Sequence, residues 1–250
     1  MIALEFVASG SKGNATLIYD GSTLIQVDMG VPLKRLKEGL SNLKKEVTDI
    51  AAVFLTHEHA DHIATLPLLR KRGAKVCSTP STCPDAETFL QSGVMMQIGS
   101  ISAMPFSSSH DASDPLNYLF FLDGKKLAFI TDTGVILKEN YPLLKDCDYY
   151  VFESNHDKTM LASSSRPLSL KRRIAGKHGH LNNQEAASYL CRFLGPHTKK
   201  IYLCHLSQEC NTPEIALETF QRVFLAKGIA FPIENVVPLR QDRLIEGIEE

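Results

Sequence analysis

Residues 56–62 constrain the fold of this chain more than any other stretch. They read Thr-His-Glu-His-Ala-Asp-His, and the residues directly before them are all apolar, as in a buried strand. In an extended segment, side chains two positions apart project to the same side, so His57 and His59 can bind one metal ion together. Where the chain then turns toward a helix this alternation ends, and Asp61 and His62 can reach a second position nearby.

The residue types in this segment predict a metal site. Neutral imidazole and carboxylate suit a hard or borderline divalent ion such as zinc, manganese or iron. The segment contains no cysteine, which argues against a closed structural zinc site. Isolated histidines are usually ordinary surface or core residues, but three histidines and an aspartate so close together favour a functional site. We therefore predict two divalent ions per chain, zinc or manganese, with iron as a third candidate.

Length and composition agree with one large domain or two fused halves. The 250 residues, 44% of them hydrophobic, can bury a full core. The formal net charge of −1 provides no global basic field, so any binding of nucleic acid must come from a local patch. We find no internal repeat, no low-complexity segment and no clear interdomain linker.

Cellular location is inferred from three features of the sequence. No apolar stretch approaches the roughly 20 residues that a membrane helix needs. The first residues form a strand-like pattern without the basic and apolar regions of a signal peptide. Six cysteines without a CxxC pair are typical of reduced, buried thiols. We expect a cytoplasmic protein that does not bind membranes.

Apolar spacing and turn signals predict alternating strands and helices. Strands are expected at residues 2–8, 15–19, 23–27, 51–55, 75–79, 95–98, 100–106, 116–122, 125–130, 148–152, 200–204, 236–239 and 244–245. Helices are expected at residues 31–43, 63–72, 85–91, 135–144 and 213–227, and between Asn182 and Gly195.

Apolar strands in this chain end repeatedly in an acid or a histidine. The residues at these strand ends are Asp28, His57, His110, Asp132, Glu153 and His205. In layered α/β architectures the strand ends of a sheet gather at one edge, so these side chains can meet in space. Asp28 is expected to orient the histidine loop by hydrogen bonds rather than to touch metal. The recurrence favours one assembled site.

Two polar segments are candidates for substrate binding. The loop at residues 9–14, with Ser11 and Asn14, has glycines and backbone N–H groups that could hold an anion such as phosphate, although a tight hairpin is an equal alternative. A basic run precedes His180 in the chain and consists of Lys171, Arg172, Arg173 and Lys177. Such a run beside the chemistry favours a polyanionic substrate, whereas by itself it would indicate a solvated helix face.

Taken together, these motifs resemble the metallo-β-lactamase superfamily over nearly the whole chain. The resemblance implies an α/β fold, the four-layer αβ/βα sandwich, with the metal site at one edge between two sheets. It assigns His57, His59 and His110 to the first ion. It assigns Asp61, His62 and His205 to the second ion, with Asp132 bridging the two. An aspartate at the bridging position is more similar to the glyoxalase and phosphodiesterase branches than to the lactam-hydrolysing one.

A closer resemblance is to the YycJ/WalJ-like group of compact bacterial proteins, regarded as exonucleases acting on DNA. It is carried by the segments at residues 9–14, 109–112, 131–134, 153–157, 179–183 and 205–211. Glu153 and His180 also resemble the acid and histidine that relay a proton in tRNA 3′-processing endonucleases, but Asn182 departs from their pattern, so tRNA cleavage is not implied. The short interval between Asp132 and His205 leaves no room for the inserted cap of the β-CASP nucleases, so residues 1–250 are expected to form a single domain.

Three functional hypotheses follow. The favoured one is a two-metal phosphodiesterase acting on nucleic acid, DNA more than RNA, in which metal-bound water attacks phosphorus and His180, oriented by Glu153, protonates the leaving group. Asp61, Glu153 and His180 are the candidate catalytic residues. The alternatives are a small-molecule hydrolase of the same fold, cleaving a cyclic phosphodiester or a thioester, and a non-catalytic metal-binding or redox protein. The native metal, the polarity of digestion and the oligomeric state are left open by the sequence.

Overall fold

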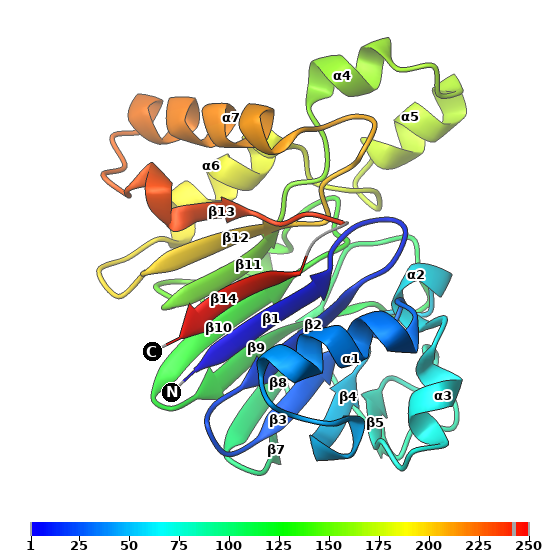
Figure 1. Cartoon of the computed structure of the whole chain (residues 1–250). Coiled ribbons are helices and arrows are strands. Elements are labelled where there is room, and N and C mark those ends of the chain that lie inside the picture. The colour runs from blue at the N-terminus through cyan, green and yellow to red at the C-terminus, as the bar shows by residue number, and fades with distance from the viewer. Residues whose placement is uncertain (1, 242–243, 250) are drawn as a thin grey trace. The chain divides into compact units, whose positions relative to one another are not determined.

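A computed structural model describes residues 2–241 and 244–249 (Figure 1). The chain divides into two compact units. Unit 1 comprises the described residues within Met1–Ser107, Ala112–Gly124 and Arg240–Glu250. Unit 2 comprises Ser108–Asp111 and Lys125–Leu239. Each unit combines strands and helices.

Unit 1 is built on a mixed sheet with the strand order β14-β1-β2-β3-β4-β5-β6. The bounds are β1 (Ala3–Ala8), β2 (Ala15–Tyr19), β3 (Leu24–Val27), β4 (Ile50–Phe54), β5 (Val76–Ser78), β6 (Thr88–Phe89) and β14 (Ile245–Glu249). Neighbours are antiparallel from β14 to β3 and parallel from β3 to β6. The strands β7 (Met96–Ile98), β8 (Ile101–Ser107) and β9 (Leu116–Leu122) pair antiparallel in sequence order. The helical segments of unit 1 are α1 (Leu33–Asn42), η1 (Val47–Asp49), α2 (Ala60–Ile63) and α3 (Leu66–Arg70).

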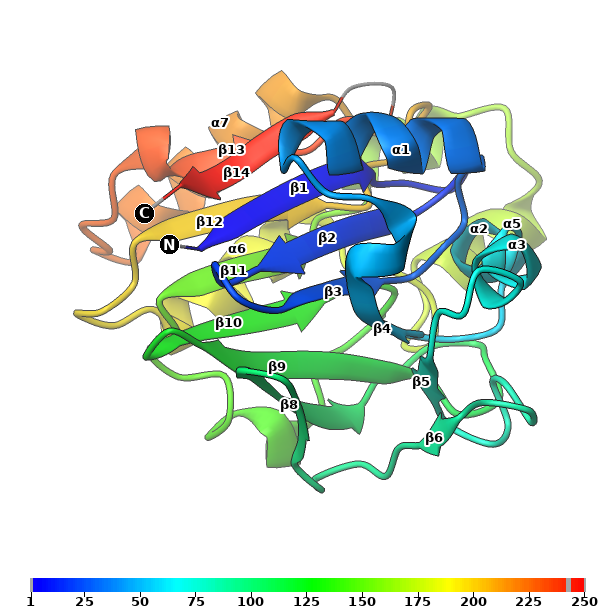
Figure 2. The same cartoon turned by 60° about the horizontal axis from the view of Figure 1, so that its bottom comes forward.

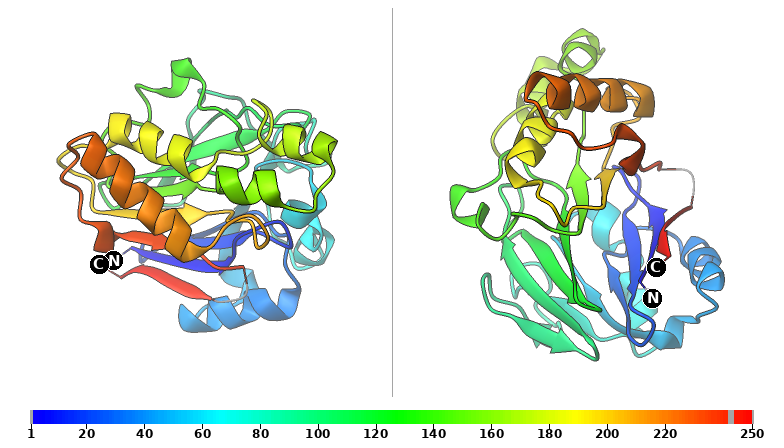
Figure 3. Two further views of the ribbon diagram at one scale, coloured as in Figure 1. Left: turned by 90° about the horizontal axis from the view of Figure 1, so that it is seen from above. Right: turned by 90° about the vertical axis from the view of Figure 1, so that its left-hand side faces the viewer.

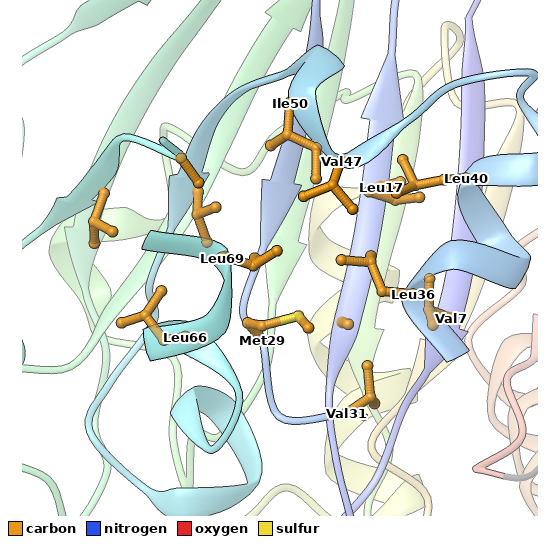
Figure 4. Close-up of a cluster of buried hydrophobic side chains, with 14 of the residues drawn as sticks. Val7, Leu17, Met29, Val31, Leu36, Leu40, Val47, Ile50, Leu66 and Leu69 are labelled. Atoms are coloured by element: carbon orange, nitrogen blue, oxygen red, sulfur yellow. The ribbon is translucent and has the colours of Figure 1, made fainter. Parts of the chain in front are cut away.

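Helix α1 lies over β1 and β2 (Figure 2). Its apolar face closes the core of unit 1. Leu36 and Leu40, four positions apart, share one helix face and are buried against Val7 and Leu17 of the sheet (Figure 4). Met29, in the loop that follows β3, belongs to the same cluster. This packing anchors the loop that carries Asp28.

Unit 2 is built on parallel strands in the order β13-β12-β11-β10. The bounds are β10 (Lys125–Ile130), η2 (Lys138–Asn140), β11 (Tyr149–Glu153), α4 (Lys158–Ser163), α5 (Leu168–Ile174), α6 (Asn183–Phe193), β12 (Lys200–Cys204), α7 (Pro213–Ala226), η3 (Ile233–Asn235) and β13 (Val236–Pro238). Helices α6 and α7 lie side by side and α7 contacts β13 (Figure 3).

The register of the parallel strands decides where the site of unit 2 forms. Ile130 of β10 is paired with Phe152 of β11, and Glu153 of β11 is paired with Cys204 of β12. Asp132 and His205 follow the last residues of β10 and β12, so they emerge with Glu153 at one carboxyl edge.

Each expected strand overlaps an observed strand, and two expected helices are wrong. Residues 85–91 contain no helix, because Thr88–Phe89 pairs with β5 and the Glu87 carboxylate accepts a hydrogen bond from Val76 N at 2.7 Å. Residues 135–144 contain only the short 3-10 turn Lys138–Asn140, since Pro142 lacks an N–H and restricts the residue before it.

Smaller differences concern four helices and the last strand. The helix expected at residues 63–72 is two short helices, α2 and α3, and Pro67 stands at the first turn of α3. Helices α4 and α5 were not predicted, and β14 extends beyond the expected residues 244–245. Asn182 caps α6 as predicted, accepting from Glu185 N at 3.0 Å. Within the part of the chain that the structure describes, there is no helix whose length and apolar character would allow it to span a bilayer.

Candidate active site

The predicted metal ligands of residues 57–62 lie in unit 1, where the chain passes from β4 into α2. His57 and His62 are buried, whereas His59 and Asp61 are half-buried. The ring centroid of His57 lies 4.5 Å from that of His59 and 4.1 Å from that of His62. Asp61 Oδ2 lies 3.6 Å from His62 Nε2. His59 has extended backbone at the N-cap of α2, so the change from strand to helix falls inside the motif, as predicted.

Asp28 orients the histidine loop by hydrogen bonds to His62 and Thr56, as predicted. Its Oδ2 lies 2.7 Å from His62 Nδ1, and because an ionised carboxylate only accepts, Nδ1 carries the proton and Nε2 keeps its lone pair. Thr56 donates to Asp28 from its backbone N at 2.8 Å and from its hydroxyl at 2.9 Å. The same hydroxyl lies 3.0 Å from His57 Nδ1. Thr56 is therefore a positioning residue to which the sequence assigned no role.

The loop at residues 9–14 supports the metal motif. Asn14 N donates to the Asp61 carbonyl at 2.8 Å, and Asn14 Nδ2 lies 2.9 Å from His62 Nε2. Gly30 packs so closely on this motif that an added Cβ would lie 1.5 Å from the Asp61 carbonyl oxygen. Ser11 is exposed. The predicted contacts of Ser11 and Asn14 with substrate stay predictions.

Unit 2 contains a second cluster of acids and histidines. Asp132, Glu153, His180 and His205 each offer a ligand atom, and these atoms lie within 4.8 Å of one another. Asp132 and His205 have φ values of 47° and 55°, a left-handed conformation that residues other than glycine rarely adopt. Because β10 and β12 end in this conformation, the chain turns sharply at the point where each side chain enters the cluster.

The carboxylate of Glu153 is the centre of the cluster in unit 2. It is fully buried; its Oε1 lies 2.7 Å from His180 Nδ1 and 3.1 Å from His205 Nδ1. Its Oε2 accepts from the backbone N of Thr133 at 2.8 Å and of Leu181 at 3.3 Å. Burial opposes ionisation, but the charge of His180 and the hydrogen bonds of His180 and His205 outweigh it and hold the pKa of Glu153 below its ordinary value.

His110 is buried and faces two carboxylates. Its Nδ1 lies 3.1 Å from the Gly179 carbonyl, so the neutral ring carries its proton there. Its Nε2 lies 3.2 Å from Asp111 Oδ1 and 3.8 Å from Asp132 Oδ1. Burial lowers the pKa of His110 despite the opposing charge of Asp132. A neutral ring directing a lone pair toward carboxylate oxygens is an arrangement that a bound cation would stabilise.

The four cations of the basic run before His180 differ in their contacts. Lys171 donates to the Ala162 carbonyl at 2.7 Å, and Arg173 pairs with Asp111. Arg172 and Lys177 are exposed. The run is thus not one uniform cationic patch, and its contact with substrate stays a prediction.

Two further residues of unit 2 were not predicted as functional candidates. Asn155 donates to the His205 carbonyl at 2.9 Å and lies 3.4 Å from His205 Nδ1. His156 follows it in the chain and is buried. Both lie in the polar segment that follows β11, and only their position after a strand end could have indicated a positioning role.

The chain is similar in sequence to a known family and to curated bacterial proteins. Residues 27–206 match a family described as beta-lactamase superfamily domain. The chain is 34% identical over 248 residues to a Bacillus anthracis protein named exodeoxyribonuclease YycJ, covering 93% of this chain and 94% of that protein. It is 33% identical over 252 residues to exodeoxyribonuclease WalJ of Streptococcus pneumoniae, covering 94% of each.

One solved structure extends this comparison to the fold. The metallo-beta-lactamase fold protein YhfI of Bacillus subtilis aligns with a TM-score of 0.74 at 13% identity, covering 98% of this chain and 99% of that one. This likeness confirms the predicted fold class.

Proposed function

Since the chain belongs to the metallo-β-lactamase superfamily, we propose that it is a metal-dependent exonuclease that hydrolyses phosphodiester bonds in DNA. The observation that carries this proposal is the identity of 34% and 33% to two exodeoxyribonucleases over nearly their whole length. The buried Glu153, which is hydrogen-bonded to His180 and His205, supports the proposal, because hydrolysis of a phosphodiester needs a proton donor for the leaving alkoxide.

We propose that the whole chain acts as one catalytic domain that holds two divalent ions, zinc or manganese. The first ion would bind His57, His59 and His110. The second would bind Asp61, His62 and His205, with Asp132 shared between the ions. The donor chemistry fits, because imidazoles and carboxylates are the ligands such ions prefer. When bound, the ions would activate a water and neutralise charge on the phosphate oxygens.

The ring orientations support this assignment. A histidine that ligates metal through one nitrogen usually donates the other N–H to a carboxylate or carbonyl group. His62 has Asp28 at its Nδ1, His110 has the Gly179 carbonyl, and His205 has Glu153. In each ring Nε2 is then the nitrogen that carries the lone pair.

We assign the proton transfer to His180. Its ring is partly exposed, with a side-chain exposure of 19%, and its Nδ1 is held by Glu153 at 2.7 Å. A protonated His180 can give the proton on Nε2 to the leaving oxygen, and the ionised Glu153 stabilises the imidazolium before the transfer. Glu153 thus acts through His180 and is a positioning residue.

The proposed substrate contacts are Ser11, Asn14, Lys171, Arg172, Arg173 and Lys177. Of the four cations, Arg173 pairs with Asp111 and Lys171 donates to a backbone carbonyl, whereas Arg172 and Lys177 have neither kind of contact among the described residues. A cytoplasmic location is proposed as well, since the six cysteines are free thiols.

A nuclease assay tests the proposal. Purified protein with manganese or zinc is incubated with end-labelled single- and double-stranded DNA, with RNA and with bis-p-nitrophenyl phosphate. We expect progressive release of nucleotides from DNA. Turnover of the small ester without any polymer would favour a small-molecule hydrolase instead, and metal binding without any turnover would favour a non-catalytic protein.

The role of His180 is tested by the dependence on the leaving group. Replacing His180→Ala should lower kcat on DNA by about 10²–10⁴-fold, the usual contribution of a general acid. The loss on bis-p-nitrophenyl phosphate should be much smaller, since p-nitrophenolate leaves without a proton. Equal losses on both substrates would contradict the assignment.

A further inference from the structure

Unit 2 contains a cavity of about 360 Å³ that is distinct from the cluster of acids and histidines. Its walls come from the chain after β10, from the end of α5 and from one face of α6. Its lining includes Gly134, Tyr141, Lys177, Glu185, Tyr189 and Arg192. This volume lies at the small end of the range of about 300–1,000 Å³ for ligand sites. It suits one small ligand unit rather than a duplex.

One wall of the cavity is aromatic. Tyr141 and Tyr189 are both half-buried, and their ring centroids lie 6.1 Å apart in an edge-to-face arrangement. Tyr189 is also stacked on Phe193 at 6.2 Å, which fixes the orientation of its ring. A rigid tyrosine ring at the border of a cavity is a suitable platform for a flat, unsaturated ring.

The rim of the cavity is cationic. Lys177 and Arg192 are exposed, and within the described part of the chain neither has an ion pair or a side-chain hydrogen bond. The one acid of the cavity, Glu185, pairs with Lys158 at 3.2 Å, which offsets its charge. Two unpaired cations next to an aromatic wall are suited to an anionic group that carries an aromatic ring.

Backbone contacts connect this cavity to the proposed catalytic residues. Gly134 N donates to the Ser109 carbonyl at 2.9 Å, and the Ser109 hydroxyl donates to the Lys177 carbonyl at 2.9 Å. An added Cβ on Gly134 would lie 2.3 Å from the Gly176 carbonyl oxygen, so two walls of the cavity are in direct contact. In the chain, Gly134 follows Asp132 by two positions, and Lys177 precedes His180 by three. A ligand in the cavity therefore lies beside the segments that carry the chemistry.

We infer that this cavity binds one nucleotide of the substrate strand, with the base against Tyr189 and a phosphate between Lys177 and Arg192. The inference rests on the proposed function and deepens it. A nuclease has to hold the strand beside the bond it cleaves, and base stacking allows this for any sequence because every base has a flat face. The cations add a contact to the backbone that is equally independent of sequence.

The test measures fluorescence anisotropy of a labelled deoxythymidine phosphorothioate strand, which resists hydrolysis, on the metal-loaded enzyme. Tyr189→Leu should weaken binding roughly tenfold, the usual effect of losing one base stack, whereas Tyr189→Phe should bind like the wild type. Lys177→Gln and Arg192→Gln should each reduce the slope of log affinity against log salt by about 0.7, the value for one phosphate of a single strand. Arg222→Gln removes the same charge from an exposed position of α7 and should change neither quantity.

A strand of abasic units separates stacking from charge. The wild type should bind the abasic strand as weakly as Tyr189→Leu binds the normal strand. Tyr189→Leu should bind the abasic and the normal strand with equal affinity. The inference fails if the wild type binds both strands equally, if folded Tyr189→Leu binds normally, or if Arg222→Gln is as damaging as Arg192→Gln. If Tyr189→Leu does not fold, equal binding of both strands by the wild type still overturns the inference, and Lys177→Gln and Arg192→Gln compared with Arg222→Gln still test the cavity itself.

The result is independent of the nuclease assay. If the wild type cleaves DNA and Tyr189→Leu binds the strand normally, the cavity does not bind a nucleotide, and the proposed function still holds. Absence of cleavage with the expected loss on the abasic strand would remove the proposed function but retain a nucleotide site.

Discussion

Single residues of the site are oriented by hydrogen bonds from side chains that carry no chemistry themselves. The Thr56 hydroxyl and the Asp28 carboxylate hold His62, and Glu153 holds both His180 and His205. These bonds fix which ring nitrogen carries a proton, and so determine which nitrogen can bind metal or transfer a proton.

His156 is a buried histidine that is supported at one ring nitrogen, since its Nδ1 lies 3.3 Å from Asn155 Oδ1. It is 1% exposed, and its Nε2 has no hydrogen-bond partner among the described residues. Burial lowers the pKa of His156 from 6.5 to about 4, against the opposing charge of Glu153. Between these two values the unfolded chain binds a proton that the folded chain does not, so this residue destabilises the fold progressively as the pH falls from 6.5 to 4.

Replacing His156→Leu should remove this part of the pH dependence. In metal-free protein, the free energy of unfolding of the wild type should fall by about 1.4 kcal/mol per pH unit more than that of the variant between pH 6.5 and 4. Urea unfolding followed by circular dichroism at several pH values measures the difference. His197→Gln is the control, because Asp146 raises the pKa of this exposed histidine and the pair is weakened as the pH rises, the opposite direction. Equal slopes for the wild type and His156→Leu would contradict the assignment.

At the scale of elements, the conformation and position of some short segments depend on neighbouring strands and loops rather than on their own sequence pattern. Thr88–Phe89 forms β6 because the edge of β5 is available for pairing, although its surroundings have helical spacing. The loop after β3 has its position fixed by the Met29 N–H, which donates to the His62 carbonyl at 2.6 Å, and by the contact of Gly30 with Asp61. The helix that carries Asp61 and His62 is therefore placed by a loop distant in sequence.

Replacing Gly30→Ala should separate this loop from the metal motif. The added methyl has no room, so the free energy of unfolding should fall by about 1–3 kcal/mol and metal affinity should fall with it. Gly73→Ala is the matched control: its Cβ would meet open space, but φ is +84°, so it should lose about 1 kcal/mol through backbone strain and keep its metal affinity. Calorimetric titration with manganese or zinc measures the affinities, and an unchanged affinity in Gly30→Ala would refute this role of the loop.

At the scale of the whole molecule, the low net charge of −1 hides local concentrations of charge. Carboxylates and histidines are gathered in unit 1 around His57 and in unit 2 around Glu153. Gathering buried polar groups is unfavourable without a compensating partner, and a bound cation supplies one.

Removal of metal should therefore lower the thermal stability of the protein. A metal at 100 times its Kd stabilises the folded state by about 2.7 kcal/mol, which for a chain of this length corresponds to a fall in Tm of about 5–10 °C on chelation. Circular dichroism is a suitable probe because the chain contains no tryptophan. Zinc or manganese added after removal of the chelator should restore the Tm, whereas calcium, which prefers oxygen ligands, should not. An identical Tm with and without metal would argue against a resident ion.

The sequence by itself determined the strand-end positions of the functional residues and, through its motifs, the family. This was possible because a buried strand followed by an acid or a histidine is a local pattern, visible without knowledge of the partner strands. Only the tertiary structure decided that Thr56 and Asn155 position histidines, that Lys171 and Arg173 already have protein partners, and that Tyr141 and Tyr189 line a cavity. These properties depend on contacts between segments far apart in the chain, and such contacts have no local signature.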